Sequence, residues 1–213
     1  MTAANDDLRA LMNAAASLRP RFTGGKPLPR LLFVTDPTRI PDPAAIVRRL
    51  PPGCGVIYRA FGAPDALTTA LILRTIATER GLVLLIGADA SLAEACGADG
   101  LHLPEREMAE AAGLKRRHPS WILTSAAHSL EAAQAAAKAG CDAVLASAVF
   151  PSRSPSAGPA MGLTAFTALV RAAALPVYAL GGVNVQTAPE LSGSGAQGFA
   201  MVEGLADAQG TPV

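Results

Sequence analysis

Eight short apolar runs, each followed by a segment with helical character, constrain the fold of this chain most strongly. Runs such as 31–35, 82–86 and 177–180 are only four or five residues long and stop at Gly or Asp-Pro, which is typical of strands. Continuous apolar strands that alternate with helices predict a parallel sheet whose outer side is covered. Eight such units in 213 residues favour a closed (β/α)₈ TIM barrel in a single domain. An open doubly wound sheet is the alternative, but no Gly-x-Gly-x-x-Gly follows the first run.

The region before the first strand predicts an extra N-terminal helix at 5–18 and an irregular Pro- and Gly-rich linker at 19–30. The predicted domain division is therefore 1–30 and a barrel at 31–213. Three segments repeat one plan, in which a helix C-cap glycine (Gly97, Gly140 or Gly195) precedes two linking residues and a strand. Later helices are predicted near 106–117, 129–139, 163–173 and 185–193, with a thin last helix at 203–209.

Composition limits the classes of partner. Half of the residues are apolar, only 16% are charged and the net charge is +1, so nothing predicts binding to nucleic acid or to an anionic membrane. No run approaches the ~20 apolar residues that a membrane span needs. Three widely spaced cysteines in apolar contexts predict buried free thiols and a cytoplasmic location. The oligomeric state stays open, with a homodimer as one option.

The glycine pair Gly181-Gly182 ends the strand at 177–180 and is followed by a helical pattern. Glycines at a strand end allow an oxyanion to approach backbone N–H groups without a Cβ in the way. A last strand near 198–202 would complete the phosphate site of a (β/α)₈ barrel. The alternative is a tight turn with no ligand.

Five segments in register resemble the thiamine phosphate synthase family, which includes the TenI-type thiazole tautomerases. They are Val34-Thr35-Asp36, Gly97–Leu103, Ala127–Glu131, Val149–Ser152 and Leu180–Val183, and the likeness runs from about residue 31 to 206. The resemblance implies a barrel that handles a thiazole phosphate. The synthase joins it to a pyrimidine pyrophosphate with Mg²⁺, whereas the tautomerase isomerises a thiazole carboxylate phosphate without a metal.

The positions that hold pyrophosphate and Mg²⁺ in the synthase differ here. Its Gln-x-Arg-x-Lys pattern corresponds to Ile57, Arg59 and Phe61, so only Arg59 remains as a candidate anion clamp. Gly87-Ala88 stand where the synthase has Asn-Asp, with Asp89 one place further along, and Glu107 matches the second metal-binding Asp. Mg²⁺ requires oxygen ligands in a tight octahedral shell, so Asp89 and Glu107 are weak candidates and no metal site is predicted.

The thiazole phosphate side matches the family better. The resemblance implies phosphate contacts from Gly181, Gly182 and the Val202-Glu203 turn, although the carboxylate of Glu203 would repel a phosphate unless it pointed away. The loop 151–162 resembles the family's mobile active-site loop, with Ser152, Arg153 and Ser154 as candidate anion contacts. The alternative is a surface loop with no ligand role.

His128 is the candidate acid/base, because it lies just past the strand at 121–124 and matches the histidine that the resemblance implies for the tautomerase. The alternative is a helix-start histidine that bonds backbone, with Ser129 as the better cap. His102 is interpreted as a satisfied strand histidine, and His118 belongs to a basic helix end.

The sequence therefore predicts a thiazole-phosphate-binding barrel, with tautomerase-like proton transfer favoured because it needs no metal. One alternative is a true thiamine phosphate synthase, a transferase for which Mg²⁺ would be the only cofactor. The other is a catalytically silent phosphate-ligand binder.

Overall fold

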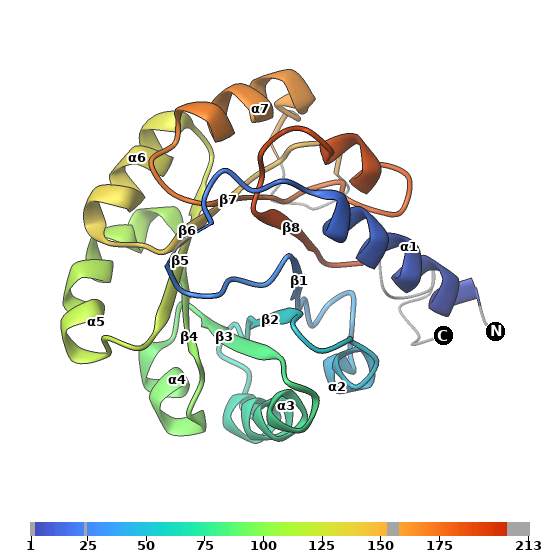
Figure 1. The fold of residues 1–213 in the computed structure, drawn as a ribbon. Helices are drawn as coiled ribbons and strands as arrows, with labels where there is room; N and C mark the ends of the chain where they lie inside the picture. The colour runs from blue at the N-terminus through green and yellow to red at the C-terminus, as the bar shows by residue number, and fades with distance from the viewer. Residues whose placement is uncertain (1–2, 24, 153–157, 204–213) are drawn as a thin grey trace.

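The computed structural model describes residues 3–23, 25–152 and 158–203 and forms the predicted closed barrel (Figure 1). All eight strands pair in parallel in sequence order, and the first strand also pairs with the last. The strands are β1 (Leu31–Val34), β2 (Gly55–Tyr58), β3 (Val83–Gly87), β4 (Gly100–Leu103), β5 (Ile122–Ala127), β6 (Ala143–Ala146), β7 (Val177–Ala179) and β8 (Gly198–Met201).

Helices surround the barrel on its outer side in Figure 1. The α-helices are α1 (Ala3–Ser17), α2 (Pro43–Val47), α3 (Ala66–Arg80), α4 (Ala90–Cys96), α5 (Ala111–Arg117), α6 (Leu130–Ala139) and α7 (Gly162–Ala172). The two 3-10 helices are η1 (Glu105–Glu110) and η2 (Ala188–Leu191). None of the described helices is both long and apolar enough to cross a membrane.

Polar side chains and glycines cap several of these helices. The side chains of Asp42, Asp89 and Ser129 accept hydrogen bonds from the first turns of α2, α4 and α6. Gly97 and Gly140 end α4 and α6 in the left-handed conformation, as predicted.

Three predicted details of the later helices are wrong or lie outside the described residues. The segment predicted as a helix at 185–193 is only the 3-10 helix η2, and Gly195 is therefore not a helix C-cap. The helix predicted at 106–117 begins as the 3-10 helix η1 and becomes α-helical only in α5. The helix predicted at 203–209 falls almost entirely on residues that the structure does not describe.

Alternating strand residues divide the core into two layers. Leu31 and Phe33 of β1 pack outward against the helices, whereas Leu32 and Val34 point into the barrel with Ile57, Leu85 and Tyr178. Because this interior is apolar, it is a packed core rather than a pore.

The linker before β1 closes the amino end of the barrel. Figure 1 shows this chain crossing the barrel before it enters β1. The hydroxyl of Tyr178 donates to the carbonyl of Pro29, Gln197 Nε2 donates to the carbonyl of Leu28 at 3.2 Å, and Leu28 packs on the interior core. The carboxyl ends of the strands are left as the open end. The division of the chain at residue 30 remains a prediction.

Candidate active site

A cavity of about 870 Å³ lies at the carboxyl end of the strands, where barrel chemistry is normally found. Every strand contributes to its wall through the strand itself or the residues just after it, and Ser152 is added from further along the β6–α7 loop. The charged and imidazole side chains of the lining are Arg39, Arg59, Asp89, His102, Arg106, His128 and Glu203. Val202, Gly181 and Gly182 line the same cavity.

The Gly181-Gly182 pair follows β7 with φ angles of +89° and +67°, which an L side chain rarely adopts. No described residue accepts a hydrogen bond from either amide, whereas both glycine carbonyls accept bonds from the protein. Two unpaired amides beside a cavity are the donors that an oxyanion needs.

A Cβ at Gly182 would not enter the open cavity. It would meet the carbonyl oxygen of Pro151 and lie 2.7 Å from Phe150 Cβ, and a Cβ at Gly181 would lie 2.8 Å from Ala148 Cβ. The expectation that a side chain here would stand in the path of the anion is therefore wrong. These glycines instead allow the loop after β6 to pack directly on the end of β7.

The predicted contacts in loop 151–162 are only partly described. Ser152 lines the cavity. Arg153 and Ser154 lie outside the residues that the structure describes, so their assignment stays a prediction.

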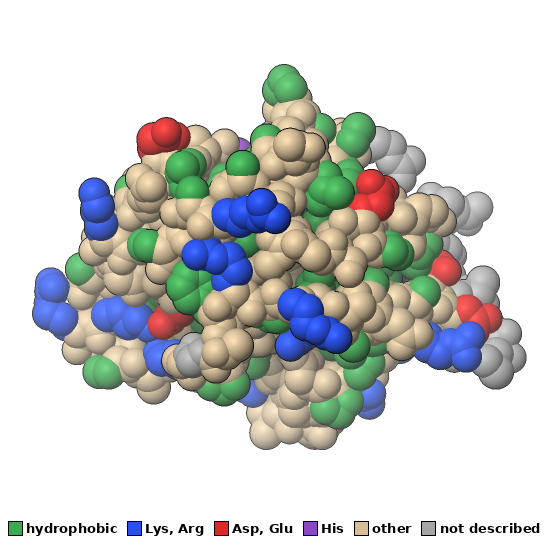
Figure 2. Space-filling model, turned by 45° about the horizontal axis from the view of Figure 1, so that its top comes forward, with side chains coloured by type: hydrophobic (Ala, Val, Ile, Leu, Met, Phe, Trp, Pro, Cys, Tyr) green, Lys and Arg blue, Asp and Glu red, His purple; other side chains and the backbone are tan. Residues whose placement is uncertain are grey.

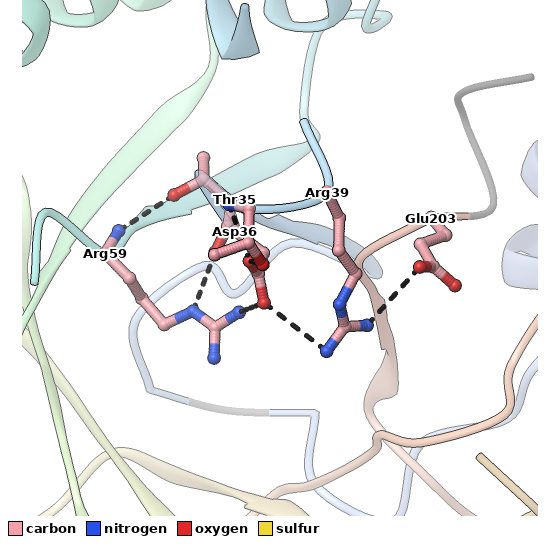
Figure 3. Close-up of polar contacts among 6 residues, drawn as sticks. Thr35, Asp36, Arg39, Arg59 and Glu203 are labelled. Atoms are coloured by element: carbon pink, nitrogen blue, oxygen red, sulfur yellow. Dashed lines mark hydrogen bonds and ion pairs between the residues drawn. The ribbon is translucent and has the colours of Figure 1, made fainter. Parts of the chain in front are cut away.

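Arg59 is held by the residues at the end of β1 (Figure 3). Its backbone N–H donates to Thr35 Oγ1 at 2.9 Å, its Nε donates to the Thr35 carbonyl at 2.7 Å, and its Nη2 lies 3.4 Å from Asp36 Oδ2. Burial lowers the pKa of Arg59, with Asp36 opposing and Arg39 adding to that effect. Arg59 therefore remains a cation, but one whose charge is already partly matched by Asp36.

Asp36 also links Arg59 to Arg39. Figure 3 shows the two guanidinium groups converging on its carboxylate, with Glu203 on the far side of Arg39. Arg39 Nη2 lies 3.3 Å from Asp36 Oδ2, and Arg39 Nη1 lies 3.7 Å from Glu203 Oε1. Burial raises the pKa of Asp36, but hydrogen bonds from Thr38 and the charges of the two arginines outweigh it and leave the pKa below its usual value.

Glu203 follows β8 at the predicted phosphate site, and its pairing with Arg39 reduces the repulsion expected from its carboxylate. Its side chain is 42% exposed, so the contribution of this ion pair to stability is small. A phosphate at this end of the cavity would compete with Glu203 for Arg39.

His128 lies just past β5, as predicted, and is paired with Glu105. His128 Nδ1 is 2.7 Å from Glu105 Oε2, and the backbone N–H of His128 donates to the same oxygen at 2.8 Å. An ionised carboxylate can only accept, so Nδ1 carries the proton and Nε2 is left to exchange one. The histidine side chain is 59% exposed, and the adjacent Ser129 is the helix cap.

His102 points from β4 into the cavity lining, with its Nδ1 2.9 Å from Thr124 Oγ1. It is a hydrogen-bonded strand histidine, as interpreted from sequence, but it also borders the candidate site. Burial, followed by the nearby charge of Arg59, lowers its pKa to about 4. His102 is therefore neutral near pH 7.

This pKa predicts an acid-sensitive contribution to stability. Because His102 binds a proton more weakly in the folded state (pKa about 4) than in the unfolded state (about 6.5), its contribution is full above pH 6.5 and falls as pH drops towards 4. Between pH 7 and pH 4 we expect the wild-type protein to lose up to about 3 kcal/mol of its free energy of unfolding through this group. His102→Gln should lack this pH-dependent loss. Urea unfolding of both proteins between pH 7 and 4 measures it; parallel curves would show that His102 is not the titrating group.

The predicted weak metal candidates do not form a metal site. Asp89 Oδ1 accepts from the backbone N–H of Leu92 as the cap of α4, and Glu107 Oε1 pairs with Arg106 at 2.8 Å. No group of three or more His, Cys, Asp or Glu among the described residues could hold a metal ion. The residues present therefore do not fit the tight oxygen shell of Mg²⁺.

Three residues of the site were not identified from sequence. Arg39 lies in a turn after β1 and Glu105 opens η1, and their roles depend on partners that follow other strands, Glu203 and His128. Phe61 was noted only as the residue replacing a lysine, yet it lines the cavity beside Arg59. A signal was present only for Phe61, as an aromatic residue just before a glycine at a strand end.

Comparison with known proteins agrees with the fold. A family model described as thiamine monophosphate synthase matches residues 31–205. The thiamine-phosphate synthase of Xanthomonas campestris pv. campestris is 38% identical over 154 residues, covering 70% of this chain and 72% of that one. That of Pyrococcus furiosus is 29% identical over 184 residues, covering 84% and 88%.

A solved structure described as thiamine phosphate pyrophosphorylase from Pyrococcus furiosus has a TM-score of 0.71 at 27% identity, covering 81% of this chain and 85% of that one. The chain belongs to the thiamine monophosphate synthase family.

Proposed function

We propose that this barrel binds a small phosphorylated heterocycle, a thiazole phosphate, at the carboxyl end of its strands. The observation that carries the proposal is the pair of amides at Gly181 and Gly182, which have no acceptor among the described residues and belong to residues that line a cavity large enough for a two-ring ligand. Arg39 and Arg59 supply positive charge in the same cavity. Family membership supports the same class of ligand.

Coupling of the thiazole phosphate to a pyrimidine pyrophosphate is the first candidate reaction, because the curated relatives are thiamine-phosphate synthases. The names of these relatives favour the synthase reaction, whereas the sequence alone favoured tautomerase-like proton transfer. Here Gly181 and Gly182 would hold the thiazole phosphate. Arg59, Arg39 and Arg106 would face the departing pyrophosphate, whose charge requires cations nearby.

The poor fit for Mg²⁺ leads to a prediction about the metal. Because Asp89 caps α4 and Glu107 is paired with Arg106, we expect no saturable Mg²⁺ binding to the ligand-free protein in sub-millimolar titration calorimetry. Asp89→Asn preserves the cap acceptor and should leave this result unchanged. Saturable sub-millimolar Mg²⁺ binding to the ligand-free protein, or an octahedral Mg²⁺ bound to Asp89 and Glu107 without a ligand, would contradict the prediction.

Proton transfer on a thiazole ring is the second candidate reaction, and the His128–Glu105 pair favours it. The carboxylate fixes the imidazole with Nε2 as its exchanging nitrogen, an arrangement suited to a general acid/base near neutral pH. His128 lines the cavity, so a ligand held by the glycine pair would share the cavity with this imidazole.

One titration series separates the reactions. The protein is mixed with thiazole phosphate, with and without pyrimidine pyrophosphate and Mg²⁺, and with thiazole carboxylate phosphate in a separate arm. Thiamine phosphate formation identifies the synthase, ring isomerisation identifies the tautomerase, and binding without turnover identifies the silent binder. Absence of thiazole phosphate binding would overturn the proposed function. A cytoplasmic location and a homodimer remain predictions.

A further inference from the structure

Phe61 is the most exposed large hydrophobic residue that the structure describes, at 71%. Its backbone has a φ of +49°, a left-handed conformation that is costly for a bulky L residue. Little of the ring is buried, so core packing does not compensate for this strain. Strained, exposed residues of this kind are concentrated at ligand sites.

The position of Phe61 indicates what the ring faces. It follows β2 and lines the cavity, whereas the other exposed large hydrophobic residues, Leu67, Leu71 and Ile72, lie on α3 and do not line it. On the face that Figure 2 shows, hydrophobic side chains are dispersed among charged and uncharged ones. Phe61 is thus an exposed aromatic residue in the wall of the cavity, whereas the exposed hydrophobic residues of α3 lie outside it.

Arg59 packs against the ring of Phe61. Its guanidinium carbon is 5.1 Å from the centroid of Phe61, within the range of a cation–π contact. Arg59 is itself fixed by the Thr35 carbonyl and by Asp36. The ring therefore has a defined support, which reduces the entropy lost when a ligand stacks on it.

The two ends of the cavity offer different chemistry. The unpaired amides of Gly181 and Gly182 follow β7, whereas Phe61 follows β2, with β8 and β1 between them in the closed barrel. A ligand that reaches both must carry an anionic group at one end and a flat apolar face at the other.

We propose that Phe61 is the stacking platform for a planar heteroaromatic ring, joined in the same ligand to the phosphate held by the glycine pair. This inference rests on the proposed function and specifies how the second ring of its substrate or product is recognised. Stacking on Phe61, with Arg59 packed against it, would take the place of the lysine charge that the family pattern has at this position.

The test compares two ligands across three variants. Inorganic phosphate probes the glycine end alone, and thiamine phosphate probes a phosphate and two rings together. Phe61→Leu keeps bulk without a π face, and Phe61→Gly also removes the backbone strain. Phe22→Leu is the matched control, because Arg21 lies 5.3 Å from the centroid of Phe22 outside the cavity.

We expect the Kd for thiamine phosphate to rise roughly 5- to 100-fold in both Phe61 variants, the range for losing one stacked ring, with phosphate affinity unchanged. Phe22→Leu should match the wild type. Phe61→Gly should retain its melting temperature, because the ring is not part of the core.

Unchanged thiamine phosphate affinity in Phe61→Leu would overturn the inference, as would wild-type protein that binds phosphate but not thiamine phosphate. A large fall in the melting temperature of Phe61→Gly would assign the ring to folding. Self-association that Phe61→Leu abolishes, with ligand affinity unchanged, would assign it to a protein contact. If wild type binds neither ligand, the proposed function fails first.

Discussion

Replacing Gly182 with valine is expected to abolish phosphate-ligand binding and to lower the free energy of unfolding by roughly 3 kcal/mol or more. The new side chain would adopt an unfavourable left-handed conformation and overlap the carbonyl of Pro151 and the Cβ of Phe150. The β6–α7 loop or the Gly181-Gly182 segment must then move, which displaces the two amides that are proposed to bind the anion. Titration calorimetry and urea unfolding measure the two effects.

Gly97→Val separates strain from overlap. Gly97 has a φ of +64°, close to the +67° of Gly182, but a Cβ there meets nothing within 4 Å, and the residue lies outside the cavity. The control should therefore lose only about 1–2 kcal/mol and keep full phosphate affinity. Wild-type affinity in Gly182→Val would show that this segment does not form the anion site.

Replacing His128 with asparagine is expected to lower proton-transfer activity on the thiazole ring by roughly 10²–10⁴-fold, the usual range for losing a general acid/base. Without a large pKa shift, carboxylates and lysine titrate far from neutral pH, whereas an ordinary imidazole titrates close to it. Stability should change little, because the side chain is 59% exposed. Phosphate affinity should also be unchanged.

His118→Asn is the matched control. His118 also pairs with a carboxylate, with its Nε2 2.8 Å from Glu94 Oε1, but it stacks on Trp121 and does not line the cavity. It should keep wild-type activity. Proton transfer that survives in His128→Asn would assign the chemistry to another base, and a marked loss of stability would make His128 structural. A coupling activity that is insensitive to His128→Asn would favour the synthase reaction.

The barrel could be predicted from sequence because each strand carries its own local signal. Buried parallel strands have continuous apolar sequences, and capping residues such as Asp89 and Ser129 mark where helices begin. The prediction of a helix at 185–193 was wrong because the polar and small residues of this segment suit a turn as well as a helix. Only the 3-10 helix η2 forms there. Local pattern does not separate these two outcomes.

The site was less predictable because its pairings join residues far apart in the chain. Arg39 and Glu203 meet only because β8 closes the barrel beside β1. Glu105 reaches His128 from the start of η1, after the neighbouring strand β4. The direction of the Cβ at Gly182 likewise depends on how the loop after β6 packs. Asp36 and Arg59, by contrast, follow the adjacent strands β1 and β2, and they form an ion pair.

A crystal structure with thiazole phosphate would test the central claim most directly. We predict that the phosphate lies within hydrogen-bonding distance of the backbone N–H of Gly181 or Gly182, with the thiazole ring in the cavity at the strand ends. A phosphate bound elsewhere, or no thiazole phosphate in the cavity at saturating concentration, would contradict the account.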